Sequence, residues 1–254
     1  MTNSAPLIIG ATGGSGTRVV ARLARHAGYD LGTHLNPAED ALEFQSFHDK
    51  WINPFLVSED RHAALPPNEA EQMKRDFQEA LSRHLTGSTT DAGARWGWKA
   101  PRTIYLLPFL YDRFPDLKFV HVLRDGRDMA SSKNQNQLRK HGAAVLSWRE
   151  RWFNPLPIRS ILLWERINLR AARFGEARLG ENYHLLRFED LCRKPIETTA
   201  RLFLFLGADA DAEKAARDEI SPPSTIDRWR GQPAALVSRL ERAANVTLQK
   251  FGYL

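Results

Sequence analysis

A glycine-rich loop near the start of the chain has the composition of an anion-binding site. It covers residues 10–17, with the sequence GATGGSGT, and four of its first seven residues are glycine. Glycines let the backbone approach an anion closely, and successive N–H groups followed by a helix N-terminus attract phosphate. A Walker A loop would have a lysine directly before its Ser or Thr, but here Gly16 precedes Thr17. The loop therefore predicts phosphate binding and disfavours an ordinary ATP or GTP site.

A second segment with phosphate-binding chemistry begins at Arg124. Residues 124–132, with the sequence RDGRDMASS, follow the most strand-like stretch of the chain and lead into a helix. A guanidinium group offers two parallel donors to a phosphate, and the Ser132 hydroxyl can reach the same anion from the first part of the helix. Taken alone, the segment is also compatible with a helix start at which Arg124 pairs with Asp128.

Short apolar runs alternate with longer segments of helical periodicity along the chain. The expected strands are residues 7–9, 29–31, 95–99, 118–123 and 183–188. The expected helices are residues 17–27, 104–114, 128–140, 143–153, 158–180, 195–206 and 234–251, with further helices in 38–86 that are broken at Asn53-Pro54 and Pro66-Pro67. This alternation predicts a three-layer α/β/α fold with a central, mostly parallel sheet, in one domain over residues 1–254.

The two phosphate-binding segments resemble the donor site of the PAPS-dependent sulfotransferase family. Ser15-Gly16-Thr17 after a strand is similar to the phosphosulfate loop of that family, and Arg124 with Ser132 is similar to its 3′-phosphate motif. Three further stretches resemble the family: residues 98–102 (WKAPR), 186–191 (LRFEDL) and 224–230 (STIDRWR). The resemblance covers residues 7–32 and 95–233 and implies the P-loop NTPase-like sulfotransferase fold.

The resemblance implies an activity and a set of nucleotide-binding residues. The chain would move the sulfuryl group of 3′-phosphoadenosine 5′-phosphosulfate (PAPS) to an acceptor and release adenosine 3′,5′-bisphosphate. The nucleotide would be bound by residues of the matching motifs, namely Gly13, Gly14, Ser15, Gly16, Thr17, Arg18, Arg124, Ser132, Arg187, Arg228, Trp229 and Arg230.

The loop departs from the family pattern at Gly14, where the family usually has a lysine or an arginine. In the family, that basic side chain stabilises the negative charge on the leaving group. The reaction still needs a cation, because charge on the leaving bisphosphate grows in the transition state. Lys99 and Arg18 are the candidates to replace it.

Transfer to a hydroxyl also needs a base near the attacking oxygen. In the family that base is a histidine or a carboxylate, and carboxylate bases tend to follow the second strand. Asp40 is our first candidate, followed by His34 and Glu39. The alternative is that Glu39 and Asp40 form the acidic first turn of a helix. The histidines and carboxylates show no spacing typical of a metal site.

Residues 33–94 fall outside the resemblance and are expected to form a helical insertion that shapes the acceptor site. The predicted acceptor is a hydroxyl of a carbohydrate or small molecule. A net charge of +6 and a pI near 9.6 are compatible with an anionic saccharide. Five tryptophans could be stacking faces for such an acceptor or anchors of the core: Trp51, Trp96, Trp98, Trp148 and Trp152.

Composition favours a cytoplasmic protein. The chain has one cysteine, Cys192, which is typical of a reducing compartment. The N-terminal residues lack the basic and apolar regions of a signal peptide, and we expect no membrane span. No strand interleaves aromatic and basic residues as RNA-binding sheets do, so no nucleic-acid partner is expected.

Two other functions are compatible with part of the pattern. A small-molecule kinase on a related scaffold would explain the glycine loop, but the loop lacks the lysine. The nearest magnesium-binding carboxylate, Asp125, is flanked by Arg124 and Arg127. A non-catalytic nucleotide-binding module would explain both the positive charge and the glycine at position 14.

Overall fold

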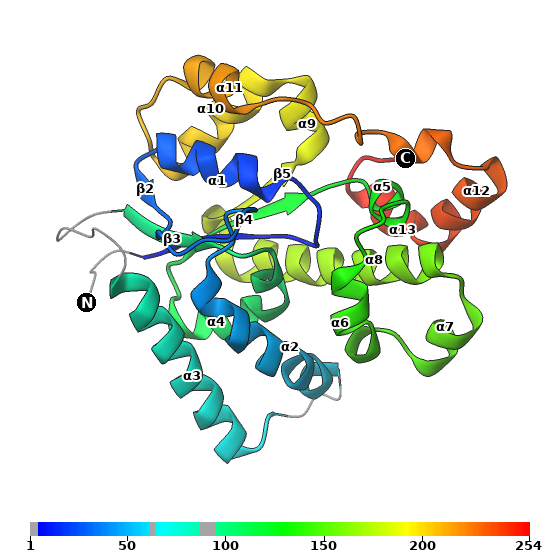
Figure 1. Ribbon diagram of the computed structural model, residues 1–254, viewed down its shortest axis with the longest axis horizontal. Helices are drawn as coiled ribbons and strands as arrows, with labels where there is room; N and C mark the ends of the chain where they lie inside the picture. The colour runs from blue at the N-terminus through cyan, green and yellow to red at the C-terminus, as the bar shows by residue number, and fades with distance from the viewer. Residues whose placement is uncertain (1–4, 61–63, 87–94) are drawn as a thin grey trace.

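The computed structural model describes residues 5–60, 64–86 and 95–254, in which five strands form one parallel sheet (Figure 1). The strands are β1 (Leu7–Gly10), β2 (Tyr29–Asp30), β3 (Arg95–Lys99), β4 (Lys118–Leu123) and β5 (Tyr183–Arg187), in the order β2-β3-β1-β4-β5. The strands of the sheet are parallel in all four pairings. The predicted α/β fold with a parallel sheet is confirmed.

Strand β1 lies between β3 and β4, and this register determines which residues meet at the edge of the sheet. Ile9 pairs with Lys99 on one side and with Val120 on the other. Because all three strands run in the same direction, their carboxyl ends share one edge. The glycine loop, the end of β3 and the start of the Arg124 segment therefore emerge side by side, where parallel α/β sheets bind ligands.

Helices cover both faces of the sheet (Figure 1). Helices α1 (Thr17–His26), α9 (Phe188–Arg193), α10 (Pro195–Leu206) and α11 (Ala212–Glu219) pack on the face to which Leu7 and Ile9 point. On the other face, which includes Ile8 and Phe119, lie α2 (Gln45–Asp60), α3 (Pro67–Thr86), α4 (Leu107–Arg113) and α8 (Leu156–Phe174). The remaining helices are α5 (Gly126–Ala130), α6 (Asn136–Val145), α7 (Trp148–Phe153), α12 (Ala234–Ala243) and α13 (Asn245–Lys250). The sheet is thus the middle of three layers.

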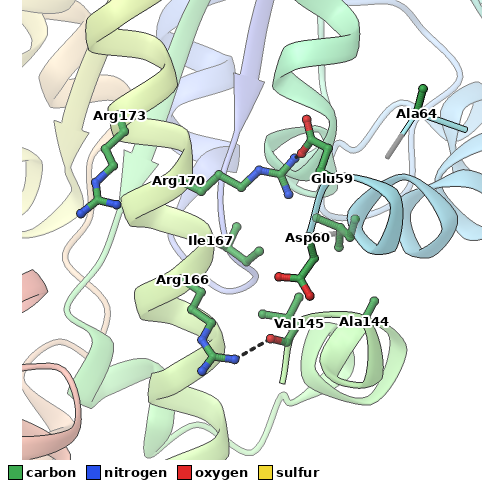
Figure 2. A pocket seen from close by; sticks show the side chains of 10 residues that line it. Glu59, Asp60, Ala64, Ala144, Val145, Arg166, Ile167, Arg170 and Arg173 are labelled. Carbon is green, nitrogen blue, oxygen red and sulfur yellow. Dashed lines mark hydrogen bonds and ion pairs between the residues drawn. The ribbon is translucent and has the colours of Figure 1, made fainter. Parts of the chain in front are cut away.

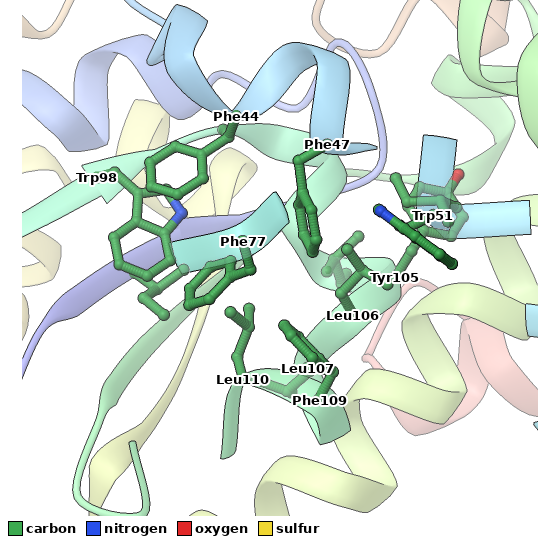
Figure 3. Close-up of a cluster of buried hydrophobic side chains, with 14 of the residues drawn as sticks. Phe44, Phe47, Trp51, Phe77, Trp98, Tyr105, Leu106, Leu107, Phe109 and Leu110 are labelled. Carbon is green, nitrogen blue, oxygen red and sulfur yellow. The ribbon is translucent and has the colours of Figure 1, made fainter. Parts of the chain in front are cut away.

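An aromatic cluster fixes the helices of the second face to the sheet (Figure 3). The Phe44 ring stacks on Trp98 of β3 at 4.7 Å, and the Phe77 ring of α3 meets Phe109 of α4 edge-on at 5.3 Å. Trp51 and Trp96 are buried as well, so three of the five tryptophans considered above are core residues. Each such ring buries a large apolar area, which explains how a strand of five residues holds α2 and α3 in place.

The structure corrects several expected helix boundaries. The expected break at Asn53-Pro54 is wrong, because α2 continues through Pro54 and buries Trp51, Ile52 and Leu56 against the core. Packing of this apolar face outweighs the loss of one backbone hydrogen bond at the proline. The expected helix 128–140 is two helices, since the Gln135 amide donates to the carbonyl groups of Met129 and Ser132 and ends α5. The expected C-terminal helix is also divided, into α12 and α13.

Candidate functional site

A cavity of about 660 Å³ opens at the carboxyl edge of the sheet, where the loop after β1 lies between the ends of β3 and β4. Residues 13–18 of the loop line it, together with Lys99 and Arg124. Gly14 and Arg124 are 110 residues apart in the sequence, yet Arg124 Nη1 donates to the Gly14 carbonyl oxygen at 3.3 Å. The fold thus brings the two predicted phosphate-binding segments into one site.

The loop has the conformation that its glycines allow. Gly16 has a φ of 81°, and a Cβ atom there would lie 2.2 Å from the ring of Phe188. A residue with a side chain would therefore be strained at this position. Gly16 is also the N-cap of α1 and offers no capping side chain, while the first turn of α1 contains no acidic residue. The positive end of this helix is available to an anion in the cavity.

Arg124 joins the loop to two other parts of the chain. Its guanidinium donates to the Asp128 carboxylate at 2.9 Å and to the backbone carbonyl of Thr225. Its Nε–H group is buried and has no hydrogen-bond partner among the described residues. Buried donors usually have a partner, so the unpaired donor marks a place where an anion would be stabilised.

Lys99 lies at the end of β3, and its ammonium group is directed to Asp40, the first candidate for the base. Lys99 Nζ donates to Asp40 Oδ1 at 2.5 Å and to the Ala38 carbonyl oxygen at 2.5 Å. The Lys99 side chain is only 2% exposed, and burial lowers its pKa below the ordinary value, although the Asp40 carboxylate opposes this effect. Asp40 also accepts a hydrogen bond from Asn36 at 3.0 Å. Lys99 and Asp40 therefore form a fixed pair of opposite charges in the cavity wall.

The other candidates for the base and for the substitute cation have different surroundings. Arg18 lines the cavity and donates to the Pro37 carbonyl oxygen at 3.4 Å. Glu39 is bound by Arg22 and Arg25 at 2.6 and 2.5 Å. His34 is 70% exposed, lies 3.3 Å from Glu43, and is not among the residues that line the cavity. Of the three base candidates, the structure brings Asp40 alone to the cavity.

The remaining predicted nucleotide ligands lie around the site rather than in its lining. Arg228 Nε donates to the Thr225 carbonyl oxygen at 3.2 Å, next to Arg124. The Trp229 ring stacks on Arg127 at 3.7 Å, and its backbone N–H donates to Asp128, which fixes this loop to α5. Arg230 extends from the same loop and lies over Trp229.

Two of the predicted ligands are engaged elsewhere. The Ser132 hydroxyl accepts from the backbone N–H of Asn134 at 3.1 Å. The Arg187 guanidinium lies over the ring of Tyr253 at 4.5 Å. The structure does not bring either side chain into the lining of the cavity.

The cavity wall also contains polar residues that we did not predict. They are Gln45, His48, Arg102, Asn136, Gln137 and Lys140. Burial lowers the pKa of His48 well below its ordinary value, and Arg102 adds to this effect, so the imidazole is neutral near pH 7. Arg102 and Lys140 both donate to Asp49 Oδ1, the latter at 2.6 Å. Arg102 belongs to a stretch that resembles the family. No local motif marks the other five side chains, because packing of α2 and α6 brings them to the cavity.

A buried polar chain supports the glycine loop from beneath. The Nε2 atom of His121, in β4, is 2.8 Å from Asn168 Oδ1, and its Nδ1 atom is 2.7 Å from the Tyr183 hydroxyl oxygen. The Asn168 amide in turn reaches the Thr12 hydroxyl of the loop at 3.4 Å. The loop is therefore connected to α8 through Asn168, and the buried imidazole connects Asn168 to β5.

A larger hollow of about 850 Å³ lies between α2, α6 and α8 and shares no lining residue with the cavity (Figure 2). Two of its three arginines are bound to acidic side chains, Arg166 to Glu150 and Arg170 to Glu59. Among the described residues that line the hollow, none belongs to a glycine loop or to the first turn of a helix. We therefore assign the candidate site to the smaller cavity.

Comparisons with known proteins identify the family. A model of the sulfotransferase family matches residues 6–212, which is more than half of the chain. The human carbohydrate sulfotransferase 6 is 31% identical over 109 residues, which are 40% of this chain and 28% of the human protein. The match thus spans less than a third of that relative.

Solved structures of sulfotransferases have a similar fold. The sulfotransferase domain of the Synechococcus PCC 7002 olefin synthase superposes with a TM-score of 0.58 at 17% identity, over 96% of this chain and 94% of that domain. The sulfotransferase STF9 from Mycobacterium avium gives a TM-score of 0.55 at 13% identity, over 98% of this chain and 77% of STF9. These similarities support the fold assigned above.

The buried imidazole predicts how stability depends on pH. Burial lowers the pKa of His121 to about 4, so the unfolded chain binds a proton between pH 6.5 and 4 that the folded chain does not. The free energy of unfolding should fall as the pH is lowered through this window, by about 3 kcal/mol for this group. Urea unfolding at a series of pH values should show a smaller slope for His121→Gln than for the wild type.

Val246→Ala, which changes an exposed side chain and removes no titratable group, provides the control and should leave the slope unchanged. His141, whose pKa burial also lowers to about 4, provides a second test if His121→Gln does not fold. Equal slopes for the wild type and for both buried-site variants would contradict the interpretation.

Proposed function

The chain belongs to the sulfotransferase family, and from this premise we propose that it transfers the sulfuryl group of PAPS to a hydroxyl of an acceptor. One observation carries the proposal: the glycine loop, Lys99 and Arg124 meet in one cavity at the ends of three adjacent strands. Together they provide an anion-binding loop, a buried ammonium group and a guanidinium group. We also propose a cytoplasmic location, because a chain with a single cysteine is typical of a reducing compartment.

The residues of the cavity fit a nucleotide that carries phosphate groups at both the 3′ and the 5′ position of its ribose. Residues 13–18 and the N-terminus of α1 would hold the 5′-phosphosulfate, since they offer backbone N–H groups and no acidic side chain. Arg124 and Arg228 would hold the 3′-phosphate, which would provide the partner that the buried Arg124 Nε–H lacks. Burial and the nearby Arg124 lower the pKa of Arg228, so a bound anion would relieve repulsion between two cations.

The bound donor would supply the sulfuryl group, and the chain would supply charge and a proton acceptor. The Lys99 ammonium group is the cation that can stabilise negative charge on the leaving side, in place of the basic residue missing at Gly14. The Asp40 carboxylate is the proposed base that takes the acceptor's hydroxyl proton. Because the two groups are hydrogen-bonded, Lys99 also fixes the orientation of Asp40.

The acceptor would occupy the half of the cavity lined by α2 and α6. Asp40, Gln45 and His48 belong to the predicted acceptor segment, residues 33–94, of which residues 61–63 and 87–94 lie outside the described part. Arg102 and Lys140 share one oxygen of Asp49, which leaves this half with excess positive charge. We therefore propose a hydroxyl acceptor that carries an anionic group, such as an acidic saccharide.

The kinase alternative loses its candidate magnesium ligand. Both oxygens of Asp125 accept hydrogen bonds from the Arg127 guanidinium, at 2.8 to 3.2 Å. A carboxylate neutralised in this way is a poor ligand for Mg²⁺. In the described part of the chain, no three side chains of His, Cys, Asp or Glu form a group that could hold a metal ion.

Ligand-induced stabilisation separates the proposed function from the kinase. Adenosine 3′,5′-bisphosphate should raise the midpoint of thermal unfolding, and ATP with Mg²⁺ should not, because binding to the folded state alone stabilises it. Arg124→Gln should abolish most of the shift, whereas Arg149→Gln, a change at an arginine that does not line the cavity, should preserve it. Stabilisation by ATP and Mg²⁺ alone would overturn the proposal.

Single substitutions test whether Lys99 or Arg18 replaces the basic residue that is missing at Gly14. With ³⁵S-labelled PAPS, Lys99→Met should slow transfer roughly 100- to 1,000-fold, as expected for loss of one preorganised charge in the transition state. The dissociation constant of adenosine 3′,5′-bisphosphate should change little.

Paired acceptors, a nitrophenyl glucuronide and the matching neutral glucoside, test the anionic acceptor in the same assay, where the glucuronide should react faster.

Arg18→Ala is the matched control for loss of a cation at the cavity and should retain most of the transfer rate. Full activity of Lys99→Met together with an inactive Arg18→Ala would assign the leaving-group charge to Arg18 instead.

A further inference from the structure

Helix α7 and the residues that follow it expose a group of large apolar side chains. Trp148 is 57% exposed, Trp152 80%, Phe153 77% and Leu156 45%. None of the six residues of α7 is buried, and the helix lies at the outer edge of the molecule, away from the sheet (Figure 1). Contiguous exposed apolar groups of this kind mark interaction surfaces. We call these four side chains, with Arg149, Arg151 and Arg159, the α7 patch.

The helix is held in a fixed conformation although it contributes nothing to the core. Ser147 and Glu150 form a capping box, in which each side chain binds the other residue's backbone N–H. Glu150 also pairs with Arg166 of α8 at 2.5 Å. A helix of six residues is unstable by itself, so these contacts present the aromatic side chains in a preformed arrangement.

The patch is positively charged. The Arg149 guanidinium lies 5.6 Å from the ring of Trp148, and the Arg159 guanidinium donates to the Arg151 carbonyl oxygen at 3.4 Å. Among the described residues, neither Arg149 nor Arg151 forms an ion pair. The one acidic residue of α7, Glu150, is already bound to Ser147 and Arg166. The surface therefore combines protruding aromatic groups with unneutralised arginines.

We propose that the α7 patch docks the protein on an anionic membrane surface. Tryptophan and phenylalanine are favoured between lipid headgroups and acyl chains, while arginines are attracted to anionic headgroups. The patch protrudes, which suits partial insertion into a lipid surface. A symmetric contact with a second copy would bring the unpaired arginines of both copies into one interface, where their like charges would repel. This proposal is independent of the sulfuryl-transfer chemistry.

Sedimentation with vesicles tests the proposal on the full chain. Vesicles of phosphatidylcholine with phosphatidylserine should bind the protein about tenfold more tightly than vesicles of phosphatidylcholine alone, and high salt should remove most of the difference. The double variant Trp152→Ala with Phe153→Ala should lose binding to both kinds of vesicle. Arg149→Gln with Arg151→Gln should lose the preference for phosphatidylserine.

Matched controls are available on the opposite part of the molecule. Leu204→Ala removes a side chain of α10 that is 82% exposed, and Arg217→Gln removes an exposed charge of α11; both should bind vesicles like the wild type. All variants change surface residues, and equal thermal midpoints would show that they fold.

Three results would overturn the proposal. One is wild-type protein that fails to bind phosphatidylserine vesicles. Another is binding that the α7 variants leave unchanged. The third is a wild-type dimer in light scattering that the aromatic double variant converts to a monomer, without vesicle binding, which would assign the patch to self-association.

Discussion

The parallel pairing of β1 with both β3 and β4 is the constraint on which the site depends. This register places the loop after β1 between the carboxyl ends of its two neighbours, so that Lys99 and Arg124 reach it from opposite sides. A shift of one residue in either pairing would turn these side chains to the other face of the sheet. The buried His121 of β4 opposes such a shift, because its hydrogen bonds with Asn168 and Tyr183 would be lost on the other face. Core packing and the geometry of the anion site therefore have the same origin.

In the proposed reaction, Lys99 compensates for the basic side chain that the loop lacks at Gly14. The loop of this protein has only backbone at position 14, but a neighbouring strand supplies an ammonium group to the same cavity. Burial makes that charge costly, and the Asp40 carboxylate and the Ala38 carbonyl offset the cost. The same contacts restrict both groups to one geometry, which a transition state can use without further reorganisation. In the proposed reaction, binding of the donor and its chemistry therefore rely on different strands of one sheet.

The sequence was most informative where function lies at the ends of strands. The glycine loop, Lys99 and Arg124 could be predicted, because parallel strands bring their carboxyl ends together whatever the details of packing. His48, Gln137 and Lys140 could not, since they reach the cavity from helices whose positions depend on the aromatic core. Arg187 was chosen from its motif alone, and the structure places it against Tyr253. The exposure of Trp148 and Trp152 was equally hidden, because the same residue types form the core at Trp96 and Trp98.

The central claim, that the cavity binds PAPS through the loop and Arg124 and places it beside Lys99, is tested most directly by a crystal structure with adenosine 3′,5′-bisphosphate. The 5′-phosphate should lie on the backbone N–H groups of residues 13–17, within reach of Lys99. The 3′-phosphate should accept a hydrogen bond from the Nε–H group of Arg124, which has no partner among the described residues. A nucleotide bound outside this cavity, or one whose 3′-phosphate lies on the glycine loop, would contradict the account.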